Sequence, residues 1–222
     1  MTRVVALLWL LAAVATPAQA QTRTSRIEVH VGGGLLGGAN LGAADADLRA
    51  NDPGRRPFRL FTTDSDLGRA PAVHIRAMIP FGGTFAVEAG VTASRPDLLI
   101  RVSGDAEGAA PVVAAGRLDQ YFMEAGLLVA LNRLTMARVV PYLTGGGGYL
   151  RQLHEGRTVV EHGEVYYAGG GVRYPFAAPA RGLVRVAGVR GEIRGYVVRG
   201  GVAVERSPRA QVAVSGGLFI GF

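Results

Sequence analysis

Four glutamates and four arginines occur at alternate positions of stretches that are otherwise apolar or small. The set is Glu28, Arg76, Glu88, Glu124, Arg173, Arg190, Glu192 and Arg194. Alternate residues of a strand share one face, so these charges are predicted to lie opposite the valine and leucine side chains. Charges enclosed in a narrow space are stable only when they are paired. The pattern therefore predicts a buried network of Glu/Arg ion pairs, with His30 and His74 on the same face.

Histidines and serines in the connecting segments raise the question of catalysis. His154 and His162 lie in one connection with three glutamates nearby, and Ser94, Ser103 and Ser207 lie in others. No nucleophile motif surrounds any of these serines, and the spacing of the two histidines is not that of a known metal site. We therefore expect no enzyme, no catalytic residue, no metal and no cofactor, with a serine hydrolase kept as an alternative.

Two glycine runs, at 145–148 and 169–171, could suggest a phosphate-binding loop. A lysine would have to follow and a helix would have to begin there, and neither condition is met. Glycines inside strands more often make room for a large side chain on the opposite wall. The runs are therefore interpreted as structural.

The first residues have the pattern of a secretory signal peptide. Arg3 precedes an apolar run at 4–14, and Ala18-Gln19-Ala20 forms a small-residue cleavage site. The run is shorter than the ~20 residues of a transmembrane helix. We predict a signal peptide over 1–20 and one exported domain over 21–222.

The composition narrows the functional classes further. The chain has no cysteine, 33 glycines and a formal net charge of +7. A basic chain could bind nucleic acid, but its arginines are scattered among acids, so no nucleic-acid partner is expected. Without an apolar run long enough for a helix after the signal peptide, a membrane protein would have to span as strands that close on themselves.

Eight stretches of the mature chain are predicted to be strands. They cover 26–36, 72–79, 84–93, 118–131, 139–150, 165–174, 183–196 and 209–222. Long connections alternate with short turns. The long connection at 40–68 lacks any clear pattern, and within the one at 94–116 residues 98–102 could extend the preceding strand. The faces of 139–150 cannot be assigned from alternation. An even number of strands with alternating short and long connections is typical of a membrane barrel with both termini on one side.

Aromatic residues sort to the two ends of these strands. Phe81, Phe85, Tyr174, Phe176 and Phe222 fall at the short-turn ends, and Tyr121, Tyr149, Tyr166, Tyr167 and Tyr196 at the long-connection ends. Aromatic rings favour the boundary between lipid and water. The distribution predicts two interfacial belts.

The final strand carries apolar residues or glycine at alternate positions and ends on an aromatic residue. Together with V-P-Y-L-T-G-G-G-G-Y, Y-Y-A-G-G-G-V-R-Y and G-V-R-G-E-I-R-G-Y, the terminal G-G-L-F-I-G-F resembles small outer-membrane barrels of the OmpA membrane-domain and OmpX type. The resemblance implies an all-β, eight-stranded antiparallel up-and-down transmembrane β-barrel in the bacterial outer membrane. It also implies that Leu218, Ile220 and Phe222 form an insertion signal for the barrel assembly machinery.

The resemblance specifies the architecture better than the activity. The leading hypothesis is a non-enzymatic monomer whose lumen is plugged by Glu/Arg pairs and whose loops touch outer-membrane lipid, lipopolysaccharide or other partners. Because no further segment follows Phe222, we expect an OmpX-like single module without peptidoglycan anchoring. Alternatives are a narrow gated pore, a lipid A-modifying enzyme on the same scaffold, and an exported soluble ligand binder with its apolar face turned inward.

Overall fold

The computed structural model describes residues 27–48, 58–108, 110–154, 159–177, 183–203 and 207–222. The predicted signal peptide at 1–20 lies outside these residues. Within them the chain is almost entirely strand. The elements are β1 (Glu28–Leu36), β2 (Ala39–Leu48), β3 (Phe58–Leu67), β4 (Ala70–Phe81), β5 (Phe85–Ser94), β6 (Asp97–Ser103), β7 (Val112–Ala130), the 3-10 turn η1 (Asn132–Leu134), β8 (Val140–His154), β9 (Val160–Ala177), β10 (Val186–Gly200) and β11 (Arg209–Gly221). No helix among the described residues is both long and apolar enough to cross a membrane.

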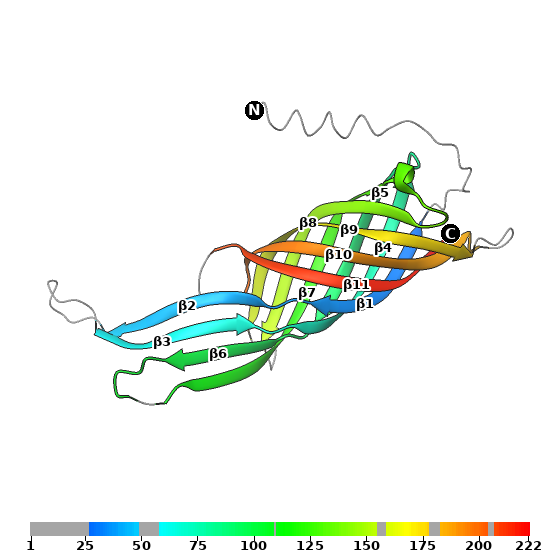
Figure 1. Ribbon diagram of the computed structural model, residues 1–222. Helices are drawn as coiled ribbons and strands as arrows, with labels where there is room; N and C mark the ends of the chain where they lie inside the picture. The colour runs from blue at the N-terminus through cyan, green and yellow to red at the C-terminus, as the bar shows by residue number, and fades with distance from the viewer. Residues whose placement is uncertain (1–26, 49–57, 109, 155–158, 178–182, 204–206) are drawn as a thin grey trace, which may run out of the picture.

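Eight of the described strands close into a ring. The order is β1-β4-β5-β7-β8-β9-β10-β11, every neighbour is antiparallel, and β1 pairs with β11 to complete it (Figure 1). The predicted eight-stranded up-and-down barrel is confirmed, and its strands correspond one for one to the eight predicted stretches. Chain-order neighbours pair because the short turns can only join antiparallel strands.

The prediction of a connection without regular structure at 40–68 was wrong, and the possible strand at 98–102 is present as β6. β2 and β3 form a hairpin, β6 pairs with β3, and the first part of β7 pairs with β6. We call this sheet of β2, β3, β6 and residues 112–117 the outer sheet. It projects from the loop end of the barrel, opposite the short turns and the C-terminus (Figure 1). The hairpin adds polar cross-strand contacts, such as Thr62 Oγ1 to Asp45 at 2.8 Å.

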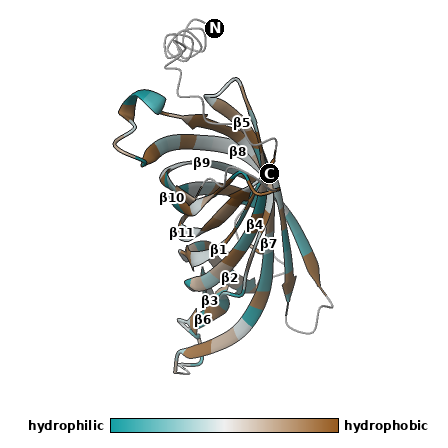
Figure 2. Cartoon of the chain, turned by 90° about the vertical axis from the view of Figure 1, so that its right-hand side faces the viewer, coloured by the Kyte–Doolittle hydropathy of each residue, from teal (hydrophilic) through white to brown (hydrophobic). Residues whose placement is uncertain are grey.

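The outer surface of the ring is an uncharged band. Hydrophobic and hydrophilic residues alternate along its strands (Figure 2). Valine, leucine, isoleucine, alanine, methionine and glycine fill the outward positions within 29–35, 73–79, 87–91, 123–127, 143–147, 168–172, 189–197 and 212–220. Strands of about ten residues, tilted by ~40°, give a band about 25 Å tall. That height matches the hydrocarbon region that a bacterial outer-membrane barrel spans.

The aromatic belts are partly as predicted. Tyr149 and Tyr166 are exposed on the outer wall at the loop end, and Tyr174 and Phe176 are exposed at the turn end. Tyr167 and Tyr196, also assigned to the loop-end belt, instead point into the lumen and are buried. The prediction considered their position along the strand and not their face, which alternation reverses at each residue.

Side chains fill the lumen in layers. From the loop end, a first apolar layer of Leu41, Leu67, Leu98 and Leu118 is followed by one that contains Leu36, Phe122, Leu150, Val165, Tyr167, Tyr196 and Val198. Charged residues come next, and Met78, Ala86, Leu128 and Tyr142 pack toward the turn end. An eight-stranded barrel has an interior that side chains can fill. Half of this interior is apolar, which the expectation of a charged lumen did not include.

Glycines in the wall make room for the tyrosines of this interior. A Cβ on Gly126 would lie 2.5 Å from the Tyr167 hydroxyl, and one on Gly171 would lie 2.5 Å from the Tyr142 hydroxyl. The Gly171 Cβ would also collide with the backbone carbonyl of Gly191. The two positions therefore have to be glycine if the tyrosines are to lie across the lumen.

Gly171→Ala is expected to lower the free energy of unfolding by about 1–3 kcal/mol, because a methyl group is forced into a packed interior. Gly191→Ala is the matched control, since Gly191 has no heavy atom within 4 Å of its Cβ position. Urea unfolding of each variant in lipid vesicles, followed by gel mobility, measures the difference. Equal losses for the two variants would contradict the packing argument.

Candidate functional site

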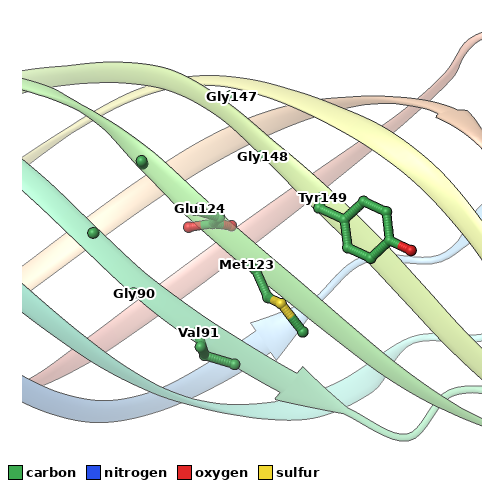
Figure 3. Close-up of a pocket in the computed structure, with 9 residues that line it drawn as sticks. Gly90, Val91, Met123, Glu124, Gly147, Gly148 and Tyr149 are labelled. Carbon is green, nitrogen blue, oxygen red and sulfur yellow. The ribbon is translucent and has the colours of Figure 1, made fainter.

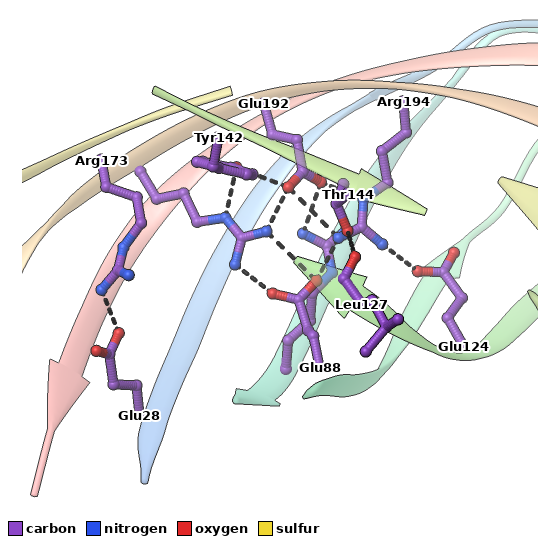
Figure 4. A network of polar contacts seen from close by, with 11 residues as sticks. Glu28, Glu88, Glu124, Leu127, Tyr142, Thr144, Arg173, Glu192 and Arg194 are labelled. Atoms are coloured by element: carbon purple, nitrogen blue, oxygen red, sulfur yellow. Dashed lines mark hydrogen bonds and ion pairs between the residues drawn. The ribbon is translucent and has the colours of Figure 1, made fainter. Parts of the chain in front are cut away.

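Strand β10 supplies the centre of the charged layer. Arg190, Glu192 and Arg194 alternate along it and all point into the lumen, where they are buried. β10 lies on the opposite side of the ring from β5, so these side chains meet Glu88 across the barrel. We call the six residues Arg76, Glu88, Glu124, Arg190, Glu192 and Arg194 the lumen cluster (Figure 4).

Glu192 is the residue on which the lumen cluster converges. Its carboxylate accepts a hydrogen bond from Arg76 Nη1 at 3.1 Å and from the Tyr142 hydroxyl at 2.7 Å. It also accepts charge-assisted hydrogen bonds from Arg190 and from Arg194. A single carboxylate thus joins three guanidinium groups from β4 and β10.

Glu88 and Glu124 neutralise the remaining charge of the arginines. Glu88 on β5 accepts hydrogen bonds from both Arg190 and Arg194, and Glu124 on β7 accepts one from Arg194 Nη1 at 2.7 Å. Three arginines thus meet three glutamates. A buried charge is tolerated only when it is compensated, and the equal numbers make the cluster neutral as a whole.

Aromatic rings support the guanidinium groups. The Cζ atom of Arg190 lies 4.6 Å from the centre of the Tyr142 ring, and that of Arg194 lies 4.5 Å from the centre of the Tyr167 ring. Arg190 Nε also donates to the Tyr142 hydroxyl at 2.6 Å. Cation–π contacts and hydrogen bonds together fix the rotamers of the two arginines. Tyr142 belongs to the strand whose faces the sequence left open.

The other two predicted residues form a separate pair. Arg173 on β9 donates to Glu28 on β1 nearer the turn end, and its Cζ lies 4.6 Å from the centre of the Phe219 ring. All eight residues predicted for the network therefore face the lumen and make ion pairs. The structure divides them into one group of six and one of two.

His30 and His74 also face the lumen but join no ion pair. Their rings lie 4.7 Å apart, centre to centre. Neither ring nitrogen of His30, nor Nε2 of His74, has a hydrogen-bond partner among the described residues. The two rings thus pack against each other and against glycines 32 and 217 of the wall.

Two of the candidate catalytic residues, Ser94 and His154, are not hydrogen-bonded to each other. Neither Ser94 Oγ nor His154 Nδ1 has a hydrogen-bond partner in the described part of the chain. His162 is exposed on the outer wall, where its Nδ1 contacts the Tyr149 hydroxyl, whereas residue 154 continues the inward positions of β8. The described residues contain no group of three or more His, Cys, Asp and Glu that could hold a metal ion.

A closed antiparallel ring of eight strands with an uncharged outer band and a filled lumen defines the class of small outer-membrane β-barrels. The chain is similar to Neisserial surface protein A, with a TM-score of 0.56 and 13% identity over 90% of this chain and 99% of that one. More distant likenesses are Ail of Yersinia pestis (TM-score 0.43, 10% identity, 87% and 99% covered) and the outer membrane protein AlkL (0.40, 14%, 94% and 93%). No protein-family model and no curated sequence matches the chain. The solved structures therefore support the fold and leave the activity to be argued from the residues.

Proposed function

We propose that this protein is a non-enzymatic, monomeric component of the bacterial outer membrane that is exported by its signal peptide and presents the outer sheet to the cell exterior. The observation that carries the proposal is the combination of an uncharged outer band with a lumen lined by buried side chains that pair across it. A barrel of this kind occupies the membrane without opening a path through it. Its contacts with the surroundings are then made by its wall and its loop end.

Two features of the structure support a closed lumen. The neutral lumen cluster fills its middle, and the segment after β10 folds over its loop end. There Val202 N–H donates to Gln152 at 2.8 Å, Gln152 donates to Gln120 at 2.6 Å, and Arg209 donates to the carbonyl oxygens of Gly200 and Val202. A lumen space beside His74, Arg76 and Tyr196 holds only about 10 Å³, roughly the room for one water.

The orientation follows from the connections. Short turns of such barrels face the periplasm and long connections face outward, so the outer sheet would extend from the cell. One of its faces is polar, with ion pairs such as Arg59 to Asp45 at 2.5 Å. This surface is suited to contacts with polar partners of the cell surface.

The C-terminal strand supports insertion by the barrel assembly machinery. Leu218, Ile220 and Phe222 are exposed on the outer face of β11. β11 closes the ring against β1, and Phe222 N–H donates to Ile27 at 2.9 Å. Because β11 pairs with β1 only when the ring closes, it is accessible until then. The three side chains can therefore be recognised before closure.

Planar-bilayer recording tests the plug. Wild-type protein is expected to be silent, and the charge-balanced variant Glu88→Ala/Arg190→Ala to conduct, because it removes two crossing side chains and keeps the cluster neutral. If the wild-type protein instead forms discrete channels whose conductance is altered by Glu124→Gln, the plugged lumen is refuted in favour of the narrow gated pore.

Mass spectrometry distinguishes the non-enzymatic protein from a lipid A-modifying enzyme. After incubation with the purified protein, the mass of lipid A is expected to be unchanged. A loss or gain of an acyl group would overturn the non-enzymatic assignment. The protein should also fractionate with the outer membrane and show heat-modifiable gel mobility, and folding in plain buffer without detergent would contradict the membrane assignment.

A further inference from the structure

The outer wall of the barrel contains a hollow of about 570 Å³ over β5, β7 and β8 (Figure 3). Its floor is formed where Ala89, Ala125 and Gly147 lie side by side in the strand register. The neighbouring rows carry larger side chains, including Val91, Met123 and Tyr149. The hollow exists because three adjacent strands place their smallest residues in one row. It faces lipid, so the occupant has to be apolar.

Arginines stand at the loop end of this hollow. Arg151 follows Tyr149 on the same outward face of β8, and its register partner on β9 is His162. Arg199 on β10 is exposed nearby, with its Cζ 5.8 Å from the centre of the Tyr166 ring. Neither arginine makes an ion pair with a residue in the described ranges. Arg151 therefore stands at the loop end of the β8 edge of the hollow, and Arg199 lies two strands further round the wall, on the far side of β9.

One carboxylate lies between the two arginines. Glu164 on β9 is the register partner of both Tyr149 and Arg199, and it accepts a hydrogen bond from the Tyr166 hydroxyl at 3.2 Å. Among the described residues, the other acid at an outward position on this part of the wall, Asp119, pairs with Arg95 at 2.5 Å. The local balance is therefore positive, and Glu164 weakens the attraction for an anion without cancelling it.

We propose that this part of the wall binds the lipid A portion of lipopolysaccharide, with a phosphate at Arg151 and Arg199 and an acyl chain in the hollow. The proposal rests on the proposed function, because the arginines meet the outer leaflet only if the loop end faces outward. It goes beyond general contact with lipid by naming lipid A as the ligand and this part of the wall as its binding site.

The chemistry of both parts favours a phosphorylated, acylated ligand. Guanidinium groups match phosphate oxygens with paired hydrogen bonds, and tyrosines beside them occupy the headgroup level. Arg151 is four positions along the strand from Gly147, which is about 13 Å at about 3.3 Å per residue. A headgroup at the arginines would thus place its chain directly over the hollow. A free phosphate would contact only the two arginines and leave the hollow empty. An ordinary anionic phospholipid is the competitor in the binding experiment.

Native mass spectrometry of the folded, full-length mature protein in detergent tests the proposal. The probes are bisphosphorylated lipid A, the same lipid without its phosphates, phosphatidylglycerol and inorganic phosphate. Wild type is expected to bind bisphosphorylated lipid A about tenfold or more tightly than each of the others. The lipid without phosphates loses the charged hydrogen bonds, inorganic phosphate has no acyl chain for the hollow, and phosphatidylglycerol carries one phosphodiester where lipid A carries two phosphate groups. Equal binding of phosphatidylglycerol would overturn the proposal.

Variants separate the two parts of the site. Arg151→Ala/Arg199→Ala is expected to abolish the preference for phosphorylated lipid A, while Arg138→Ala/Arg185→Ala, which removes two exposed arginines from the turn end, leaves it. Glu164→Gln is expected to strengthen binding severalfold. An unchanged preference in the first variant would refute the proposal.

The hollow has its own control. Ala125→Leu fills it and is expected to weaken binding of lipid A with or without phosphate, whereas Ala210→Leu, on the outward face of β11 on the opposite side of the ring, is expected to have no effect. Equal effects would exclude the hollow as the acyl-chain site. Heat-modifiable mobility of each variant shows that the barrel is folded, so a failure to bind lipid A leaves the proposed function intact. A failure to form a detergent-dependent barrel would instead overturn the proposed function.

Discussion

Glu192→Gln is expected to lower the free energy of unfolding of the barrel by about 3–5 kcal/mol, the range found when one partner of a buried ion pair is removed. Glutamine keeps the shape of the side chain but removes the negative charge that three buried arginines share. The lumen cluster would then hold three guanidinium groups against two carboxylates. The measurement is equilibrium unfolding by urea in lipid vesicles.

Glu28→Gln is the matched control for this prediction. Glu28 pairs with Arg173, and the Arg173 side chain is 18% exposed, so water can partly solvate the charge left behind. The expected loss is about 1–2 kcal/mol, between those of a surface pair and a fully buried one. If the two variants lose equal stability, Glu192 has no special place in the cluster.

A second variant distinguishes charge balance from lost hydrogen bonds. Arg76→Gln alone leaves three glutamates against two arginines, and Arg76→Gln combined with Glu192→Gln restores the balance. The double variant should be more stable than the sum of the single losses predicts, because each change removes the charge that the other leaves uncompensated. Strict additivity would mean that the two residues do not interact across the lumen.

The ring itself could be predicted from the sequence because its rules are local. Valine and isoleucine at alternate positions of residues 72–79 mark a strand with two different faces, and the Pro80-Phe81-Gly82-Gly83 turn requires the next strand to run back beside it. Four such pairs of strands in succession are compatible with one topology, the up-and-down ring. The same alternation placed the eight charged residues on the inner face, since a lipid-facing position would exclude them.

Other features depend on information that alternation does not contain. The β2–β3 hairpin has Asp45, Asp64 and Asp66 on one face, but the other face mixes small and polar residues such as Ala44, Thr63 and Ser65, so no apolar period marks it. Glycines at 145–148 carry no side chain, so alternation cannot assign the faces of β8. The inward face is identified by Tyr142, whose hydroxyl donates to Glu192 in the lumen. Which glutamate serves which arginine depends on strands on opposite sides of the ring, a relation that exists only after closure.

Ile75→Arg is expected to lower the free energy of unfolding by about 2–4 kcal/mol, as a charge on the lipid face near the middle of the membrane does. Ile75 lies on the outward face of β4, well inside the uncharged band, and is 54% exposed. In a water-soluble protein, a substitution at such an exposed position would change stability by less than about 0.5 kcal/mol. The size of the effect therefore reports which solvent bathes the wall.

Leu35→Arg tests whether the loss of stability depends on the depth of the arginine in the membrane. Leu35 is also outward and is 64% exposed, but it lies at the loop end of β1, opposite Pro71 of β4. There an arginine can reach the headgroups, and the expected loss falls to about 0–1 kcal/mol. Unfolding both variants in the same vesicles gives the comparison. Two small losses would show that no hydrocarbon surrounds the band, whereas a loss that shrinks from Ile75 to Leu35 is the signature of a wall that crosses a bilayer.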